Sequence, residues 1–208
     1  SCMELKNLHV LQRLMDLSQD CFLVPGPVRM GQECLDAMST PVMTARGPEF
    51  RDVMAHLNSG LRNCFNLAPS KPLRGVQSWS GDDDYKVVVV SGSGTAAMEM
   101  VIANRFRSND LVLVPTNGKF GERVAEMCQR FCNVKHLKYE WGRAFDLYEL
   151  EQQLERGCYE SLLICHNETS TGITQDAAAI AEMCIRHNTS FILDGITSVG
   201  GMPVHPTE

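Results

Sequence analysis

The sequence predicts an α/β fold, a mostly parallel sheet with helices on both faces. From Tyr85 onward, short apolar runs rich in β-branched residues alternate with longer stretches whose apolar residues recur at helical spacing. Strands and helices that alternate in this way are typical of a parallel sheet wrapped by helices. A chain of 208 residues, 44% hydrophobic and 21% charged, is long and apolar enough to bury one good core.

The predicted elements follow one another along the chain. The predicted strands are "KVVVV" (86–90), "LVLV" (111–114), "VKHLKY" (134–139), "SLLICH" (161–166) and "SFILD" (190–194). The predicted helices are "TAAMEMVIANRF" (95–106), "KFGERVAEMCQRF" (119–131), "DLYELEQQLERG" (146–157) and "DAAAIAEMCIRH" (176–187). In the second helix four apolar residues share one face: Val124, Met127, Cys128 and Phe131.

The first 84 residues lack this alternation. Residues 5–17 and 50–65 have helical spacing, "VPGPVRM" (24–30) is a stiff turn bounded by proline, and residues 67–85 form a loop rich in Pro, Gly and Ser. We therefore expect an N-terminal helical extension at 1–22, a segment with the proline turn, a helix and a surface loop at 23–84, and the sheet domain at 85–208.

Composition excludes several classes of protein. The net charge is −6, from 25 acidic and 19 basic residues, and no basic run occurs, so we expect no nucleic-acid partner. No stretch approaches the roughly 18 to 20 apolar residues of a membrane span, and the N-terminus lacks a signal peptide. We therefore expect no membrane partner and a cytoplasmic or other reducing intracellular location.

The nine cysteines are scattered, and several have apolar neighbours, so we expect reduced and mostly buried thiols. Cys128 and Cys132 lie one helical turn apart and could form a metal pair. Because no second Cys or His pair stands at zinc-finger spacing, we expect no metal site.

The candidate site lies where polar, glycine-containing segments follow the predicted strands. Four such segments occur: "SGSGT" (91–95), "PTNGKFG" (115–121), "HNETSTG" (166–172) and "DGITSVGG" (194–201). Ligands of open parallel sheets bind outside the carboxyl ends of the strands. A single glycine after a strand is explained by turn geometry alone. Four polar, glycine-containing segments at four strand ends instead predict a shared site.

The segment 91–95 has the composition of an anion site. Gly92 and Gly94 let the backbone approach a ligand, while Ser93, Thr95 and the free amides of a helix N-terminus favour phosphate. The alternative is a plain capped turn with Thr95 as the cap. The segment is neither a P-loop, since no lysine follows the second glycine, nor a dinucleotide fingerprint, since the third glycine is absent.

Three further side chains suit a planar cofactor. Phe120 at the next helix start could stack on a ring, Thr169 offers a hydroxyl, and Asp194 is an acid at a strand end. Each residue also has a purely structural alternative: a core aromatic for Phe120, a turn residue for Thr169 and a cap for Asp194. The set fits pyridoxal phosphate, because an aspartate opposite the pyridine nitrogen keeps the ring protonated. Flavin mononucleotide is the competitor, but a carboxylate disfavours its anionic reduced ring.

Six motifs follow one another along the chain: "LVPGPVRM", "RGPEF", "SGSGTAAMEMV", "NGKFGER", "HNETSTG" and "ILDGITSVGGMPV". In this order they resemble the class V aminotransferases of fold type I, in the group of alanine:glyoxylate, serine:pyruvate and 2-aminoethylphosphonate:pyruvate transaminases. The similarity runs from Leu23 to the C-terminus. It implies the large domain of this fold, a homodimer, pyridoxal phosphate, and amino transfer between a small amino acid or aminophosphonate and a 2-oxo acid such as pyruvate or glyoxylate.

The resemblance assigns cofactor contacts. Ser93, Gly94 and Thr95 match the phosphate loop, and Phe120 matches the ring-stacking position, which is usually Trp or Tyr. Thr169 matches the hydroxyl that bonds the ring's phenolic oxygen. Asp194 matches the catalytic partner of the pyridine nitrogen.

It also assigns substrate contacts. Pro25, Gly26 and Pro27 match a loop near the substrate carboxylate. Arg46 matches a substrate contact in a segment that often reads His-Arg, so Ala45 departs from the pattern. The alternative for Arg46 is a solvated loop arginine.

One departure is larger. Family members have a Schiff-base lysine one strand beyond the aspartate, whereas the last lysine here is Lys138. Lys119 is better explained as a solvated helix-start residue. We therefore expect an N-terminal fragment, inactive alone, with a sheet short of strands and an exposed edge. A desulfurase, a lyase or a non-catalytic subunit of the same fold are the alternatives.

Overall fold

The computed structural model describes residue 26, residues 28–67 and residues 85–206. By its internal contacts the chain divides into two units, Ser1–Thr44 and Ala45–Glu208. The predicted helix at 5–17 and nearly all of the predicted loop at 67–85 lie outside the described residues. The predicted domain limits stay predictions.

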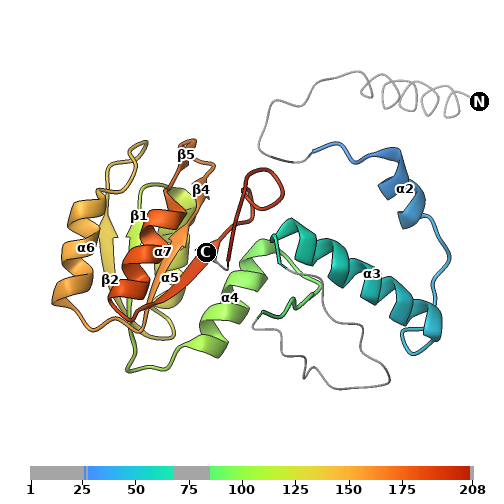
Figure 1. Cartoon of the computed structure of the whole chain (residues 1–208), viewed down its shortest axis with the longest axis horizontal. Helices are drawn as coiled ribbons and strands as arrows, with labels where there is room; N and C mark the ends of the chain where they lie inside the picture. Colours follow the sequence, from blue (N-terminus) through green and yellow to red (C-terminus); the bar gives the residue numbers. More distant parts are fainter. Residues whose placement is uncertain (1–25, 27, 68–84, 207–208) are drawn as a thin grey trace, which may run out of the picture. The chain divides into compact units, whose positions relative to one another are not determined.

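The second unit contains the predicted parallel sheet (Figure 1). Its four strands have the order β2-β1-β3-β6, and every neighbouring pair is parallel. The strands are β1 (Leu111–Thr116), β2 (Asn133–Lys138), β3 (Ser161–Cys165) and β6 (Ser190–Asp194). Four of the five predicted strands are therefore confirmed. In the register of the last pair, Cys165 lies opposite Asp194 at the carboxyl edge.

Helices cover both faces of this sheet, as predicted (Figure 1). The helices are α4 (Gly94–Arg105), α5 (Lys119–Cys128), α6 (Leu147–Arg156) and α7 (Ala177–Arg186). Successive strand residues point to opposite faces. Val112 and Val114 pack with α4 and α5, whereas Leu113 between them packs with α6 and α7.

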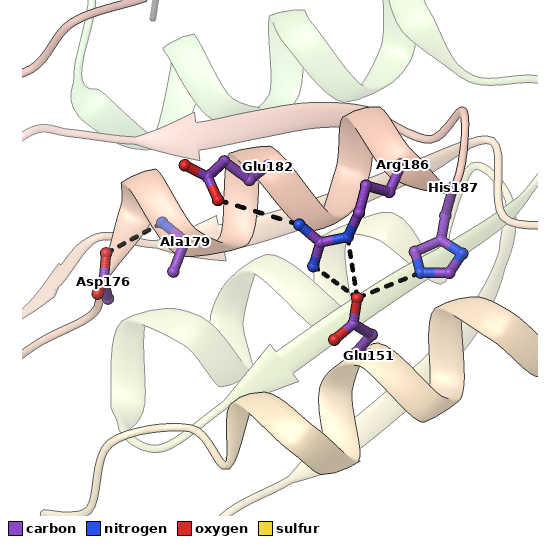
Figure 2. Close-up of polar contacts among 6 residues, drawn as sticks. All are labelled: Glu151, Asp176, Ala179, Glu182, Arg186 and His187. Atoms are coloured by element: carbon purple, nitrogen blue, oxygen red, sulfur yellow. Dashed lines mark hydrogen bonds and ion pairs between the residues drawn. The ribbon is translucent and has the colours of Figure 1, made fainter.

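An ion-pair cluster joins α6 to α7 (Figure 2). Arg186 donates to Oε1 of Glu151 from Nε at 3.1 Å and from its terminal nitrogen at 2.5 Å. His187 Nε2 lies 3.6 Å from the same oxygen. Helix α7 begins with a capping bond, in which the Ala179 amide donates to the Asp176 side chain at 3.0 Å (Figure 2).

The strand predicted at 86–90 is wrong. Residues 85–90 form no helix or strand, and Val88, Val89 and Val90 are 69%, 48% and 57% exposed. β-branched residues favour extended backbone, but a strand also needs a neighbour to exchange hydrogen bonds with. Among the described residues this segment has no strand partner, so its predicted role as the strand before α4 is not realised.

Three elements complete the described chain. Helix α3 (Pro48–Cys64) confirms the helix predicted at 50–65. Helix α2 (Gln32–Met38), in the first unit, was not predicted and has no buried residue. A hairpin of β4 (Asn167–Glu168) and β5 (Ile173–Thr174) was also not predicted, because strands of two residues carry no periodic signal.

Candidate functional site

Two of the polar segments, 166–172 and 194–201, are joined by hydrogen bonds. His166 Nδ1 lies 2.8 Å from Ser198 Oγ, and the His166 amide donates to the Asp194 carbonyl at 3.0 Å. Asn167 Nδ2 donates to Thr197 Oγ1 at 3.2 Å. The turns after β3 and β6 therefore form one connected edge.

The segment 91–95 approaches this edge through Gly94. The backbone of Gly94 lies against the side chain of Ile196, whose Cδ1 occupies the place that a Cβ on Gly94 would take. Ile196 lies two residues beyond Asp194 and its amide donates to Asp194 Oδ1 at 3.2 Å. The first turn of α4 thus lies against Ile196, whose amide holds the acid.

The segment 115–121 is connected through Glu168, a residue that the sequence analysis did not select. Its side chain is fully buried. Oε2 accepts from the amides of Phe120 at 3.1 Å and Gly121 at 2.9 Å. Oε1 accepts from Ser170, at 3.2 Å from its amide and 2.5 Å from its hydroxyl. The start of α5 is therefore tied to the hairpin that carries Thr169.

A cavity of about 1270 Å³ opens against β6 within this unit. Its walls include Gly94 from α4, His166 from the end of β3, and Asp194 and Ile196 from the end of β6. Gly94 of the predicted phosphate loop and the predicted acid therefore line one space, whereas Ser93 and Thr95 do not line it. Phe120 and Thr169 do not line this cavity, and they join the site only through the hydrogen bonds of Glu168 and of the hairpin.

Asp194 has the electrostatics of a cation-binding group. Burial raises the pKa of its carboxyl group, the amide of Ile196 opposes that shift, and the charge of Glu168 adds to it. An ionised carboxylate held in such surroundings lacks solvation, so a positively charged ligand beside it is stabilised. The side chain is half-buried at the edge of the cavity, which leaves it accessible to such a ligand.

The start of α4 has the electrostatics of an anion-binding group. Ser93 Oγ accepts from the Ala96 amide at 3.2 Å, so Ser93 is the cap and the alternative with Thr95 as cap is wrong. The amides of Gly94 and Thr95, the first two of the helix, have no acceptor within it. They remain directed toward an external acceptor.

The other helices on the sheet begin at carboxylates. Asp146 caps α6, Asp176 caps α7, and Glu168 fills the N-terminus of α5. A carboxylate there neutralises the partial positive charge of the helix end. Of the four helices that pack on the sheet in the described part of the chain, α4 alone begins with a neutral hydroxyl, so the partial positive charge of its N-terminus is not neutralised by a carboxylate.

The match to a family model decides the family. Residues 41–208 match the model described as aminotransferase class-V. The chain belongs to the aminotransferase class-V family. This confirms the resemblance seen in the motifs and the predicted fold.

Individual relatives of this class-V chain carry related descriptions. It is 30% identical over 187 residues to the (S)-ureidoglycine–glyoxylate transaminase of Bacillus subtilis, covering 89% of this chain and 41% of the relative. It is also 30% identical to the soluble hydrogenase 42 kDa subunit of Anabaena cylindrica, covering 88% and 45%. The crystal structure of alanine–glyoxylate aminotransferase from Nostoc superposes with a TM-score of 0.75 at 34% identity, covering 88% and 45%. The chain spans less than half the length of these relatives.

The substrate contacts predicted for this class-V chain stay predictions. Pro25 and Pro27 lie outside the described residues, and Gly26 is exposed in the first unit. Arg46 is exposed two residues before α3, and its role stays a prediction. Lys119 is exposed at the start of α5.

No group of three or more metal-binding side chains occurs in the part of the class-V chain that the structure describes. Cys128 and Cys132 instead pack in the core, where Cys132 Sγ donates to the Cys128 carbonyl at 3.3 Å. Burial raises the pKa of the Cys128 thiol to about 12, which disfavours the thiolate that a metal requires. Over the same described residues, no helix combines the length and the apolar character needed to cross a membrane.

Sequence reasoning missed two linking residues of the class-V site, Glu168 and Ser198. Glu168 could have been found, because it is the acidic residue of the polar segment 166–172, which the sequence analysis had already selected. Ser198 carries no comparable signal, since one serine in a glycine-rich turn is ordinary turn composition.

Proposed function

We propose that this chain is the cofactor-binding part of a pyridoxal-phosphate-dependent transaminase. The reaction moves an amino group between a small amino acid or aminophosphonate and a 2-oxo acid such as pyruvate or glyoxylate. The observation that carries the proposal is the contact of Gly94 with Ile196, which sets a neutral helix N-terminus beside the half-buried Asp194. An anion site next to a cation site fits a cofactor with a phosphate at one end and a protonated ring nitrogen at the other.

The residues present fit this cofactor. The amides of Gly94 and Thr95 and the hydroxyl of Ser93 bind the phosphate, and their small side chains leave room for it. Bound pyridoxal phosphate supplies an electron-withdrawing ring. Asp194 holds the proton on the ring nitrogen, and that positive charge in turn favours the ionised carboxylate.

Two further side chains orient the ring in this proposal. Phe120, 39% exposed at the start of α5, stacks on one ring face. Thr169, half-buried in the turn of the β4–β5 hairpin, bonds the phenolic oxygen through its hydroxyl. From the resemblance we also propose that residues 25–27 belong to a loop near the substrate carboxylate and that Arg46 contacts the substrate.

The relatives support the substrate class. One is described as a glyoxylate transaminase of ureidoglycine, and one solved structure as an alanine–glyoxylate aminotransferase. We also propose a homodimer and a reducing intracellular compartment. The reducing compartment is supported by the seven free cysteines of the described residues, four of which are buried.

A cofactor titration tests the proposal. Equilibrium dialysis of the 208-residue chain against pyridoxal phosphate is expected to show one saturable site, which Asp194→Ala and Ser93→Asp weaken. Glu155→Gln, an exposed change on α6, is the matched control and is expected to bind as the unmodified chain does. Failure of the unmodified chain to bind, or unchanged binding by Asp194→Ala, would contradict the proposal.

One relative favours a second candidate. The Anabaena protein described as a hydrogenase subunit is as similar as the transaminase relative. If the same dialysis shows no saturable cofactor, a non-catalytic subunit of this fold becomes the better explanation.

A further inference from the structure

The carboxylate of Glu168 is the most completely enclosed charged group of the described sheet unit. It is fully buried, and its two oxygens accept four hydrogen bonds, two from α5 and two from Ser170. An ionised carboxylate without such donors would be very costly to bury. Here four donors and the positive end of α5 offset that cost.

The backbone leaves space for this carboxylate because residue 118 is a glycine. A Cβ on Gly118 would lie 2.3 Å from Glu168 Cγ and 2.7 Å from Ser170 Oγ. The Ser170 hydroxyl, which donates to Glu168, accepts in turn from the Lys119 amide at 2.9 Å. Three consecutive amides at the start of α5 therefore bond to Glu168. The amides of Phe120 and Gly121 donate to it directly, and the amide of Lys119 reaches it through the Ser170 hydroxyl.

The two oxygens hold different parts of the proposed ring site. Oε2 fixes the backbone of Phe120, and Oε1 fixes Ser170, the neighbour of Thr169. The Glu168 carbonyl also accepts from Gly172 at 2.8 Å and closes the turn that contains Thr169. One residue thus sets the separation between the stacking side chain and the hydroxyl.

We propose that Glu168 is a positioning residue of the ring-binding half of this site, acting through Phe120 and Thr169. By filling the N-terminus of α5, it also leaves α4 as the helix end that receives the phosphate. The inference rests on the proposed function, since it concerns the same cofactor site.

The electrostatics of the edge agree with this role. Burial is the main cause that raises the pKa of Asp194, and the charge of Glu168 raises it further. The same charge also adds to the raised pKa of Cys165. A second negative charge behind Asp194 strengthens the attraction of the edge for a cationic ring.

Substitution by glutamine gives a test with matched geometry. In Glu168→Gln one oxygen becomes an NH₂ group. At the Oε2 position this group would face two backbone amides and lose two hydrogen bonds, whereas at the Oε1 position it loses the bond from the Ser170 amide and the Ser170 hydroxyl must turn to accept from it. We expect the Kd for pyridoxal phosphate to rise about tenfold, as when outer-shell supports of a metal site are removed. The Kd for inorganic phosphate, which requires only α4, is expected to stay unchanged. Glu155→Gln serves as the control.

A double-mutant cycle separates positioning from general destabilisation. If Glu168 acts through Phe120, then adding Glu168→Gln to Phe120→Ala costs much less pyridoxal phosphate affinity than Glu168→Gln costs alone. Additive losses, equal losses for phosphate and cofactor, or unchanged cofactor binding by a folded Glu168→Gln would each overturn the proposal. If that variant does not fold, Ser170→Ala, which removes one donor, is expected to show the same pattern with about a threefold loss, and no loss would overturn it.

Failure of the proposed function is distinguishable from failure of the positioning role. It appears as an absence of cofactor binding in the unmodified chain. The positioning role is then read in the cofactor-free chain from amide hydrogen exchange of Phe120 and Gly121. Faster exchange in Glu168→Gln than in Glu155→Gln supports the role, and equal exchange overturns it.

Discussion

Gly118 and Glu168 are packed so closely that the glycine has no room for even one more carbon atom. A Cβ at Gly118 would lie 2.3 Å from Cγ and 2.5 Å from Cδ of the glutamate. The Gly118 backbone is extended, with φ of −179°, a conformation that any residue adopts. The requirement for glycine is therefore steric.

Gly118→Ala is expected to destabilise the chain by about 2 kcal/mol, because a fully buried carboxylate with four hydrogen bonds cannot move aside. Urea unfolding followed by circular dichroism measures the change. Gly60→Ala is the control: nothing lies within 4 Å of its added Cβ in α3, so it should stabilise by roughly 0.5 to 1 kcal/mol. Equal stability of the two variants would refute the steric account.

Asp194→Asn is expected to separate stability from cofactor binding. The folded pKa of Asp194 is raised above its ordinary value of 3.8, so the ionised form opposes folding. Stability therefore falls as the pH rises from about 3.8 through the raised folded pKa, and the asparagine variant should lack this fall. Its affinity for pyridoxal phosphate should drop by about 2 kcal/mol, roughly 30-fold in Kd. Unfolding at several pH values and equilibrium dialysis measure the two effects.

Ser93 combines a helix cap with a proposed phosphate contact, and two substitutions separate these roles. Ser93→Ala removes the cap and should cost about 1 kcal/mol of stability as well as phosphate affinity. Ser93→Asp keeps a capping oxygen but adds a negative charge, so stability should remain while phosphate binding is lost. Thermal unfolding and phosphate titration are the measurements. Phosphate binding by Ser93→Asp would exclude this helix end as the anion site.

Glu151→Gln is expected to weaken the α6–α7 contact modestly and in a pH-dependent way. The bonds from Arg186 hold the pKa of Glu151 below its ordinary value. Their contribution is fully present above the ordinary pKa of 4.5 and is lost as the pH falls through the lowered folded pKa. The difference in Tm from the unmodified chain should therefore shrink in acid and in high salt. Glu182→Gln, which removes only a 3.9 Å exposed pair, should change Tm less.

Thiol labelling is expected to divide the described cysteines into two sets. Exposed thiols should react with a disulfide reagent in the native chain, and buried thiols only after unfolding. The exposed residues are Cys34, Cys64 and Cys158, and the buried ones are Cys128, Cys132, Cys165 and Cys184. Burial raises the pKa of both Cys128 and Cys165 to about 12. Peptide mass mapping reads each site, and rapid native labelling of Cys165 would contradict its burial.

The sequence predicted those features that depend on local periodicity. Helix α6, for example, has its cap, apolar face and terminal glycine within twelve residues, from Asp146 to Gly157. The strand predicted at 86–90 failed because β-branched composition cannot supply a pairing partner. The cap of α4 was misplaced by two residues, since Ser93 and Thr95 carry the same hydroxyl chemistry.

The candidate site was predictable as a set of segments but not as a set of bonds. The order of strands places Asp194 at the carboxyl edge, which follows from topology rules. The bond between Glu168 and Gly121 joins residues 47 positions apart. No local pattern encodes such a distance, so the residue that organises the start of α5 could be found only in three dimensions.

The exposed valines at 88–90 also affect how the chain should be handled. Three large side chains at least 48% exposed, on a backbone outside any sheet, form a short segment able to pair edge to edge with another strand. At high protein concentration we therefore expect oligomers rich in intermolecular β-structure, nucleated at this segment. Val89→Lys should delay their appearance in light scattering, because like charges would then meet wherever two such segments align.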